Sequence, residues 1–189
     1  DICYDNISKM LNILKNYKNI LLLCSDHPGY GGAATNCNQL QLFLNKHNHN
    51  TFSIYYNFNN DKNKTYSSND YYRIVDQDKL MDAINNCKFT PDLIILRNTV
   101  PIDINIIKNI SPVYYIVAGI YKNKLDTYFH NITHHNKYIN ETVLNQIKGA
   151  DKSFISDLKS QQILKNRYNL KTHLFYSNLV SYYNTYPVK

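Results

Sequence analysis

Short apolar runs alternate with amphipathic stretches along the whole chain. Residues 20–24 are Ile-Leu-Leu-Leu-Cys, a continuous apolar run typical of a strand buried on both faces. A turn with three glycines follows, and residues 33–46 then carry apolar side chains at helical spacing. Parallel neighbouring strands need a crossover connection, which is usually a helix. The alternation therefore predicts an α/β, Rossmann-like parallel sheet with helices on both faces.

The same alternation divides the whole chain into strands and helices without an internal boundary, so residues 1–189 are expected to form one domain. Predicted strands cover residues 19–25, 51–56, 71–75, 92–96, 113–117, 153–155 and 172–176. Predicted helices cover residues 6–17, 33–46, 78–87, 103–110, 140–148 and 157–168. Ligands of such sheets bind at the carboxyl ends of strands where the strand order reverses. The loops after Ser25, Leu96 and Val117 are therefore the candidate sites.

Composition excludes several classes of protein. The chain has 43% hydrophobic and 19% charged residues, which is not the composition of a disordered chain, and no apolar run approaches the length of a membrane span. The net charge is +7, but only three of the 21 basic residues are arginines and no basic run exists, so no nucleic-acid partner is expected. Abundant Asn, Lys, Ile and Tyr indicate an AT-rich genome, such as that of a giant virus, and this codon bias explains the charge.

Neither the cysteines nor the histidines form a recognisable metal motif. The four cysteines have no C-x-x-C spacing, so free thiols in a reducing, cytoplasmic compartment are expected. His130, His134 and His135 lack an H-E-x-x-H pattern and have few carboxylates nearby. They are interpreted as solvated loop residues, and no metal is expected.

The loop after the first predicted strand is the most informative segment. Residues 29–34 are Gly-Tyr-Gly-Gly-Ala-Ala and lead into a predicted helix. Glycines let a ligand approach the backbone, and a helix start favours an anion such as a phosphate. A tight turn without a ligand is the alternative, although three glycines within residues 29–32 exceed what a turn requires.

The glycines of this loop could belong to one of two nucleotide-binding motifs, the dinucleotide fingerprint or the P-loop. Gly29-x-Gly31-x-x-Ala34 fits the Ala-ending dinucleotide fingerprint, so an NAD(P)-type oxidoreductase is one alternative function. The acid expected near the end of the second strand is absent before Asp61, and residues 26–28 separate the loop from the strand. A P-loop is excluded because no Gly-Lys-Ser/Thr sequence follows the glycines.

Three segments, in order along the chain, carry a family resemblance. They are the strand at residues 20–25 with its loop Gly31-Gly32-Ala33-Ala34, the strand at 112–117, and the segment 149–156 with the helix that ends at Arg167-Tyr168. Together they resemble the N-terminal, acceptor-side domain of GT-B glycosyltransferases, family 4 in particular. The resemblance implies one lobe of a GT-B fold.

The resemblance also implies a function. The full enzyme would transfer a sugar from a nucleotide-sugar donor to a glycan or protein hydroxyl, in a cleft between this domain and a C-terminal domain of the same gene product. No cofactor would be bound in this domain. Tyr30, Gly31, Gly32 and Ala33 would approach the donor diphosphate, where backbone N–H groups can stabilise developing negative charge. The acid common after the glycines and the His common after the central strand are both missing here.

Further candidates for the acceptor cleft follow the predicted strands at their carboxyl ends. They are Asp26, His27, Arg97, Asn98 and Gly119. Arg97 could bind a phosphate or a carboxylate, or form a surface ion pair instead.

The single Glu of the chain bears on the missing half of such an enzyme. The family carries two Glu residues seven positions apart in its C-terminal domain, and this chain has only Glu141. The sequence is therefore expected to be the N-terminal half, inactive as an isolated domain. A non-catalytic interaction domain of the same fold remains a further alternative.

Overall fold

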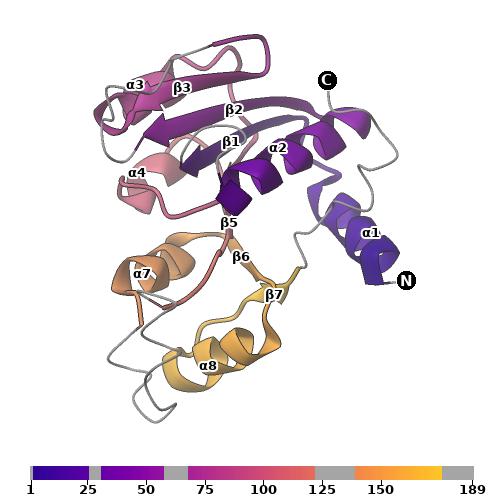
Figure 1. Cartoon of the computed structure of the whole chain (residues 1–189), viewed down its shortest axis with the longest axis vertical. Helices are drawn as coiled ribbons and strands as arrows, with labels where there is room; N and C mark the ends of the chain where they lie inside the picture. Colours follow the sequence, from indigo (N-terminus) through magenta and orange to yellow (C-terminus); the bar gives the residue numbers. More distant parts are fainter. Residues whose placement is uncertain (1, 26–30, 58–67, 122–138, 176–189) are drawn as a thin grey trace.

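The computed structural model describes residues 2–25, 31–57, 68–121 and 139–175. Its seven strands form one parallel sheet in the order β3-β2-β1-β4-β5-β6-β7 (Figure 1). The strands are β1 Asn19–Ser25, β2 Asn50–Asn57, β3 Tyr72–Asp76, β4 Leu93–Leu96, β5 Val113–Ile116, β6 Lys152–Ile155 and β7 His173–Leu174. The expectation of an α/β, Rossmann-like parallel sheet is confirmed.

The helices cover both faces of this sheet. They are α1 Ile2–Leu14, α2 Gly31–Lys46, α3 Leu80–Asn85, α4 Ile104–Lys108, α7 Glu141–Gly149 and α8 Leu158–Tyr168, with a 3₁₀ turn at Gln77–Lys79. Helices α1 and α2 pack on one face, and α3, α4, α7 and α8 contribute to the core on the other (Figure 1). Adjacent residues of β1 divide between these two cores, which explains its continuous apolar run: Leu21 and Leu23 join one, and Ile20 and Leu22 join the other.

The strand order reverses at β1. From β1 the chain adds β2 and then β3 on one side, and it later adds β4 to β7 on the other. Strands β1 and β4 are therefore neighbours, with Leu23 opposite Leu96 at the carboxyl end of the pair. At its start, β1 is held by the Asp92 carboxylate, which accepts hydrogen bonds from the backbone N–H groups of Lys18 and Asn19 at 2.9 Å each.

Side-chain caps define the two C-terminal helices. The Asn140 side chain accepts hydrogen bonds from Thr142 N and Val143 N at the start of α7. Asp157 does the same for Lys159 N and Ser160 N at the start of α8, and the hydrogen bond from the Ser160 hydroxyl lowers the Asp157 pKa. At the end of α8, Asn169 adopts a left-handed conformation with φ 52°, which stops the helix.

Some predicted boundaries differ from the structure. The first helix ends at Leu14 instead of residue 17, because residues 15–18 turn the chain into β1. The helix predicted at 78–87 is a 3₁₀ turn followed by the short α3. The helix predicted from residue 33 begins two residues earlier, so Gly31 and Gly32 belong to α2 and not to the preceding turn. Within the described ranges, no helix is long and apolar enough to cross a membrane.

The packing of Gly149 against Ile104 can be tested by a single substitution. A Cβ added at this last residue of α7 would lie 2.2 Å from Ile104 Cγ2, and Ile104 is a buried, β-branched side chain. We expect Gly149→Ala to lower the free energy of unfolding by about 1–3 kcal/mol through overpacking. Urea unfolding followed by circular dichroism measures this change.

The matched control is Gly32→Ala in α2. A Cβ there would meet nothing within 4 Å. Because alanine favours a helix more than glycine, this variant should be as stable as the wild type or up to about 1 kcal/mol more stable. Equal stability of Gly149→Ala and the wild type would contradict the close contact between α4 and α7.

Candidate functional site

The carboxyl ends of β1 and β4 form the switch point of the sheet, where a ligand site is expected. Ser25 ends β1, and Arg97 and Asn98 follow β4 directly. The backbone N–H of Arg97 donates to Leu23 O at 2.8 Å, which continues the pairing of the two strands by one residue. Helix α2 begins at Gly31, and its second turn reaches Arg97 through Asn36. The structure therefore brings two of the predicted residues to the switch point, Arg97 beside the second turn of α2 and Asn98 beside the end of β1.

Arg97 is the most unusual residue of this site. Its side chain is only 7% exposed, and its Nε donates to Asn36 Oδ1 at 3.1 Å. Its Nη1 atom is buried and finds no hydrogen-bond partner within the described part of the chain. Burial lowers the Arg97 pKa. The alternative of a surface ion pair for Arg97 is wrong, because the side chain is buried and no ion pair to it occurs among the described residues.

Neighbouring strands fix the loop that follows Arg97. Asn98 Nδ2 donates to Ser25 Oγ at 2.9 Å, and Asn98 Oδ1 accepts from Thr99 N at 2.8 Å. The Tyr56 hydroxyl donates to Thr99 O at 2.5 Å, and the Thr99 and Tyr115 hydroxyls lie 3.1 Å apart. Asn98, expected to face an acceptor, thus uses both ends of its side chain to hold the loop. The site is therefore prearranged by hydrogen bonds to β1, β2 and β5.

Two buried thiols lie on the α2 side of the sheet. Cys24 on β1 and Cys37 on α2 are both fully buried, and neither forms a disulfide. A hydrogen bond from the Cys24 thiol lowers the Cys37 pKa, burial opposes this effect, and the positive charge of Arg97 adds to the lowering. The expectation of free thiols is confirmed for these two residues.

The glycine-rich loop is only partly described. Asp26, His27 and Tyr30 lie outside the described residues, as do His130, His134 and His135. Gly32 is exposed, and no packing contact within 4 Å accounts for the absence of a side chain at this position; Ala33 is half-buried.

Gly119 also belongs to the predicted site residues. It lies three residues beyond the end of β5, exposed and equally open around its Cα. Within the described ranges no hydrogen bond joins Gly119 to Arg97 or Asn98, whose side chains bond to Asn36 and Ser25 instead.

Sequence reasoning missed several residues of this site. Asn36 could have been found, because it lies four positions after Gly32 and so on the same side of the helix. Tyr56, Thr99 and Tyr115 had no such signal, since only the strand order places β2 and β5 around the loop after β4.

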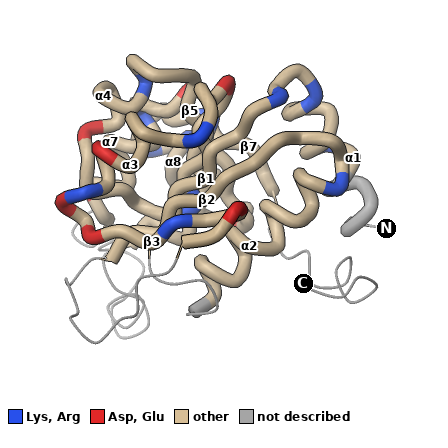
Figure 2. The backbone as a smooth tube through the Cα atoms, turned by 90° about the horizontal axis from the view of Figure 1, so that it is seen from above, with Lys and Arg blue, Asp and Glu red and all other residues tan. Residues whose placement is uncertain are grey.

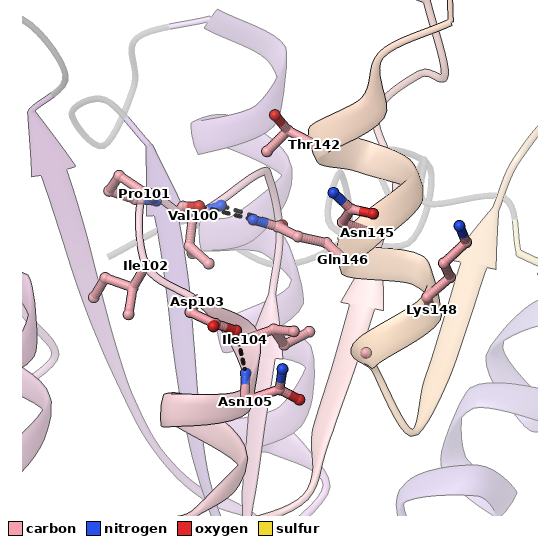
Figure 3. A pocket seen from close by; sticks show the side chains of 11 residues that line it. Val100, Pro101, Ile102, Asp103, Ile104, Asn105, Thr142, Asn145, Gln146 and Lys148 are labelled. Carbon is pink, nitrogen blue, oxygen red and sulfur yellow. Dashed lines mark hydrogen bonds between the residues drawn. The ribbon is translucent and has the colours of Figure 1, made fainter.

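A hollow lies where the loop after β4 meets α7. It has a volume of about 760 Å³ and is lined by residues 100–105 and by the exposed side of α7 (Figure 3). The Gln146 amide points from α7 toward Val100, with Nε2 donating to Val100 O at 2.7 Å and Oε1 accepting from Val100 N at 3.3 Å (Figure 3). Here α7 supports the far end of the same loop that carries Arg97 and Thr99.

Neither metal-binding side chains nor basic residues gather at one place in the described part of the chain. Within it, no three His, Cys, Asp or Glu side chains come together as a metal site would require. The Lys and Arg residues are distributed over several elements and do not gather on one of them (Figure 2).

Comparisons with known proteins gave structural similarity only. No protein family and no curated protein matches the sequence. One similar solved structure is an alpha-glucosyltransferase in complex with UDP and a 13-mer DNA containing a HMU base, with 16% identity and a TM-score of 0.50 over 90% of this chain and 46% of that chain. Another alpha-glucosyltransferase, with UDP and a 13-mer DNA containing a central A:G mismatch, has 17% identity and a TM-score of 0.49 over 90% of this chain and 44% of that chain.

These similarities concern the fold. The chain spans less than half the length of the glucosyltransferase chains that it matches. The parallel sheet with helices on both faces agrees with the expected lobe of a GT-B fold.

The hydrogen bonds to Thr99 predict a coupled effect on stability. Tyr56→Phe and Tyr115→Phe each remove one hydrogen bond to this residue, so each should lower the free energy of unfolding by about 1 kcal/mol. Because both hydroxyls hold the same residue, the double variant should lose less than the sum of the two. Urea unfolding of the three variants forms the cycle, and strictly additive losses would contradict a shared anchor.

Tyr115 also predicts a loss of stability at high pH. Burial raises its pKa to about 12 from the ordinary value of 10.0. The unfolded chain therefore releases this proton first, so the stabilisation is complete below pH 10 and disappears as the pH rises through about 12. Unfolding free energies measured across this window should fall more steeply for the wild type than for Tyr115→Phe. Parallel curves would show that Tyr115 is not protected in the folded state.

Proposed function

We propose that this chain is the acceptor-side lobe of a glycosyltransferase that uses a nucleotide-sugar donor. The observation that carries the proposal is the start of α2 at the switch point. Gly32 is exposed there, and no packing contact requires it to be a glycine. A glycine weakens a helix by about 1 kcal/mol relative to alanine. Close approach of a ligand to the backbone accounts for a glycine at such a position.

The chemistry of this position suits the diphosphate of a donor. The first backbone N–H groups of a helix lack partners within the helix and carry the positive end of its dipole. Helix α2 has 16 residues and no acidic residue in its first turn, so no carboxylate of that turn opposes an anion. N–H groups already aimed at the leaving phosphate stabilise the negative charge that develops as the sugar departs.

The similarity of fold supports the same proposal. Fold alone does not define function, but the matched alpha-glucosyltransferase structure was solved with UDP. We propose that the donor half belongs to a second domain, which would make the present chain inactive by itself.

Two classes of acceptor have to be distinguished, DNA and a glycan or protein hydroxyl. The matched structures contain DNA, whereas the sequence predicts a glycan or protein hydroxyl and no nucleic acid. We retain the glycan or protein acceptor, because the basic residues are dispersed over several elements (Figure 2). Binding of a 13-mer DNA to the chain would favour DNA as the acceptor instead.

The oxidoreductase alternative lacks support at β2. A dinucleotide-binding site needs an acid near the end of the second strand to hold a ribose hydroxyl. Strand β2 ends at Asn57, and no acid lies within it. We therefore favour the transferase.

Gly32→Ala tests the proposed donor position. The added methyl group would occupy the space of the ligand, so we expect at least about a tenfold loss in affinity for UDP-glucose, with the stability kept. Isothermal titration calorimetry of the wild type and the variant measures this. Asn38→Ala, farther along the same helix, is the control and should bind as the wild type does. An unchanged affinity of Gly32→Ala would refute the proposed donor position, and no binding of any nucleotide sugar by the wild type would refute a contact between this lobe and the donor.

A further inference from the structure

We propose that Arg97 is a specificity-determining residue of the switch-point site, and that it makes this site take a phosphoryl or diphosphate group instead of an uncharged ligand. The inference rests on the proposed function for the position of the ligand at α2. It narrows the phosphate-or-carboxylate role expected for Arg97 from the sequence to the selection of a phosphoryl or diphosphate group.

The first argument is the burial of an uncompensated charge. The guanidinium remains protonated in proteins, and a buried charge is costly unless it is paired. Arg97 is 7% exposed, and the partner of its Nε is a neutral amide. Its Nη1 is buried and has no hydrogen-bond partner among the residues that the structure describes. Among the described residues, no carboxylate pairs with it.

The groups around Arg97 are weak substitutes for a carboxylate. The neighbours that interact with its charge are Cys24, Cys37 and Tyr115. Burial raises the pKa of Tyr115 to about 12, so this phenol is neutral at physiological pH. Both thiols are neutral when protonated, and the Cys37 pKa is the one that is lowered, so among these three neighbours Cys37 is the group that would compete with an external anion if it ionised.

The position of Arg97 points to an external anion. Its Nε is bound to Asn36, and Asn36 lies one turn after Gly32 in α2. The guanidinium therefore lies beside the second turn of α2, a helix whose first N–H groups have no partners within the helix. An anion at that helix start gains the helix dipole and the Arg97 charge together. A neutral ligand would leave the buried charge uncompensated.

The experiment compares three ligands on variants of the chain. Pyrophosphate, UDP and uridine are titrated by calorimetry into the wild type, Arg97→Met and Arg97→Lys, and into Arg73→Met as an exposed control on β3. The wild type and Arg73→Met are expected to bind pyrophosphate and UDP, with uridine at least about tenfold weaker. Arg97→Met should bind pyrophosphate at least about tenfold more weakly, and Arg97→Lys should lie between. Equal pyrophosphate affinity of Arg97→Met and the wild type would overturn the inference.

Thermal unfolding without ligand separates this role from a structural one. Removal of an uncompensated buried charge should leave the melting temperature of Arg97→Met equal to that of the wild type or higher. A fall of more than about 4 °C would show that Arg97 is paired inside the protein and would overturn the inference. Cys37→Ala should leave the pyrophosphate affinity unchanged, whereas a tenfold rise would identify the Cys37 thiolate as the counter-ion and would overturn it as well.

The two proposals fail in different ways. If pyrophosphate binds through Arg97 but no nucleotide sugar binds, the anion site is supported and the proposed contact of this lobe with the donor is refuted. If UDP-glucose binds and depends on Gly32 but not on Arg97, the donor position stands and the role of Arg97 falls.

Discussion

Strand β1 is buried on both faces and paired along both edges. The arrangement of the other strands follows from this constraint. Six of its seven residues are buried, and their backbone groups have no water to bind. Strand β2 pairs with one edge of β1 and β4 with the other. A chain that must supply both neighbours of its first strand reverses its strand order there. The switch point at the carboxyl ends of β1 and β4 is the direct consequence.

The candidate site follows from this reversal. Arg97 comes directly after the last residue of β4, so it emerges between β1 and α2 and becomes buried. The loop after it is then held by Tyr56 on β2 and by Tyr115 on β5. Hydrogen bonds of this kind set the positions of side chains before a ligand arrives, and a preorganised site loses less free energy to ordering when it binds.

The fold determines the position of the site more strictly than it determines the function. A sheet of this type supports many activities, and the similar glucosyltransferases share only about one residue in six with this chain. The proposed function therefore depends on the chemistry at the switch point. An exposed glycine that packing does not require and a buried arginine without a carboxylate partner both favour an anionic ligand.

The sequence by itself determined the elements of this protein. The apolar run at residues 20–24 placed β1, and helical periodicity placed α2, because burial on two faces or on one leaves a pattern within a few residues. It also indicated that Arg97 and Asn98 follow a strand at its carboxyl end. Only the tertiary structure decided that Arg97 is buried, that Tyr56 and Tyr115 converge on Thr99, and that Ile104 packs on Gly149. These contacts join elements far apart in the chain, and they depend on the strand order, which no local pattern specifies.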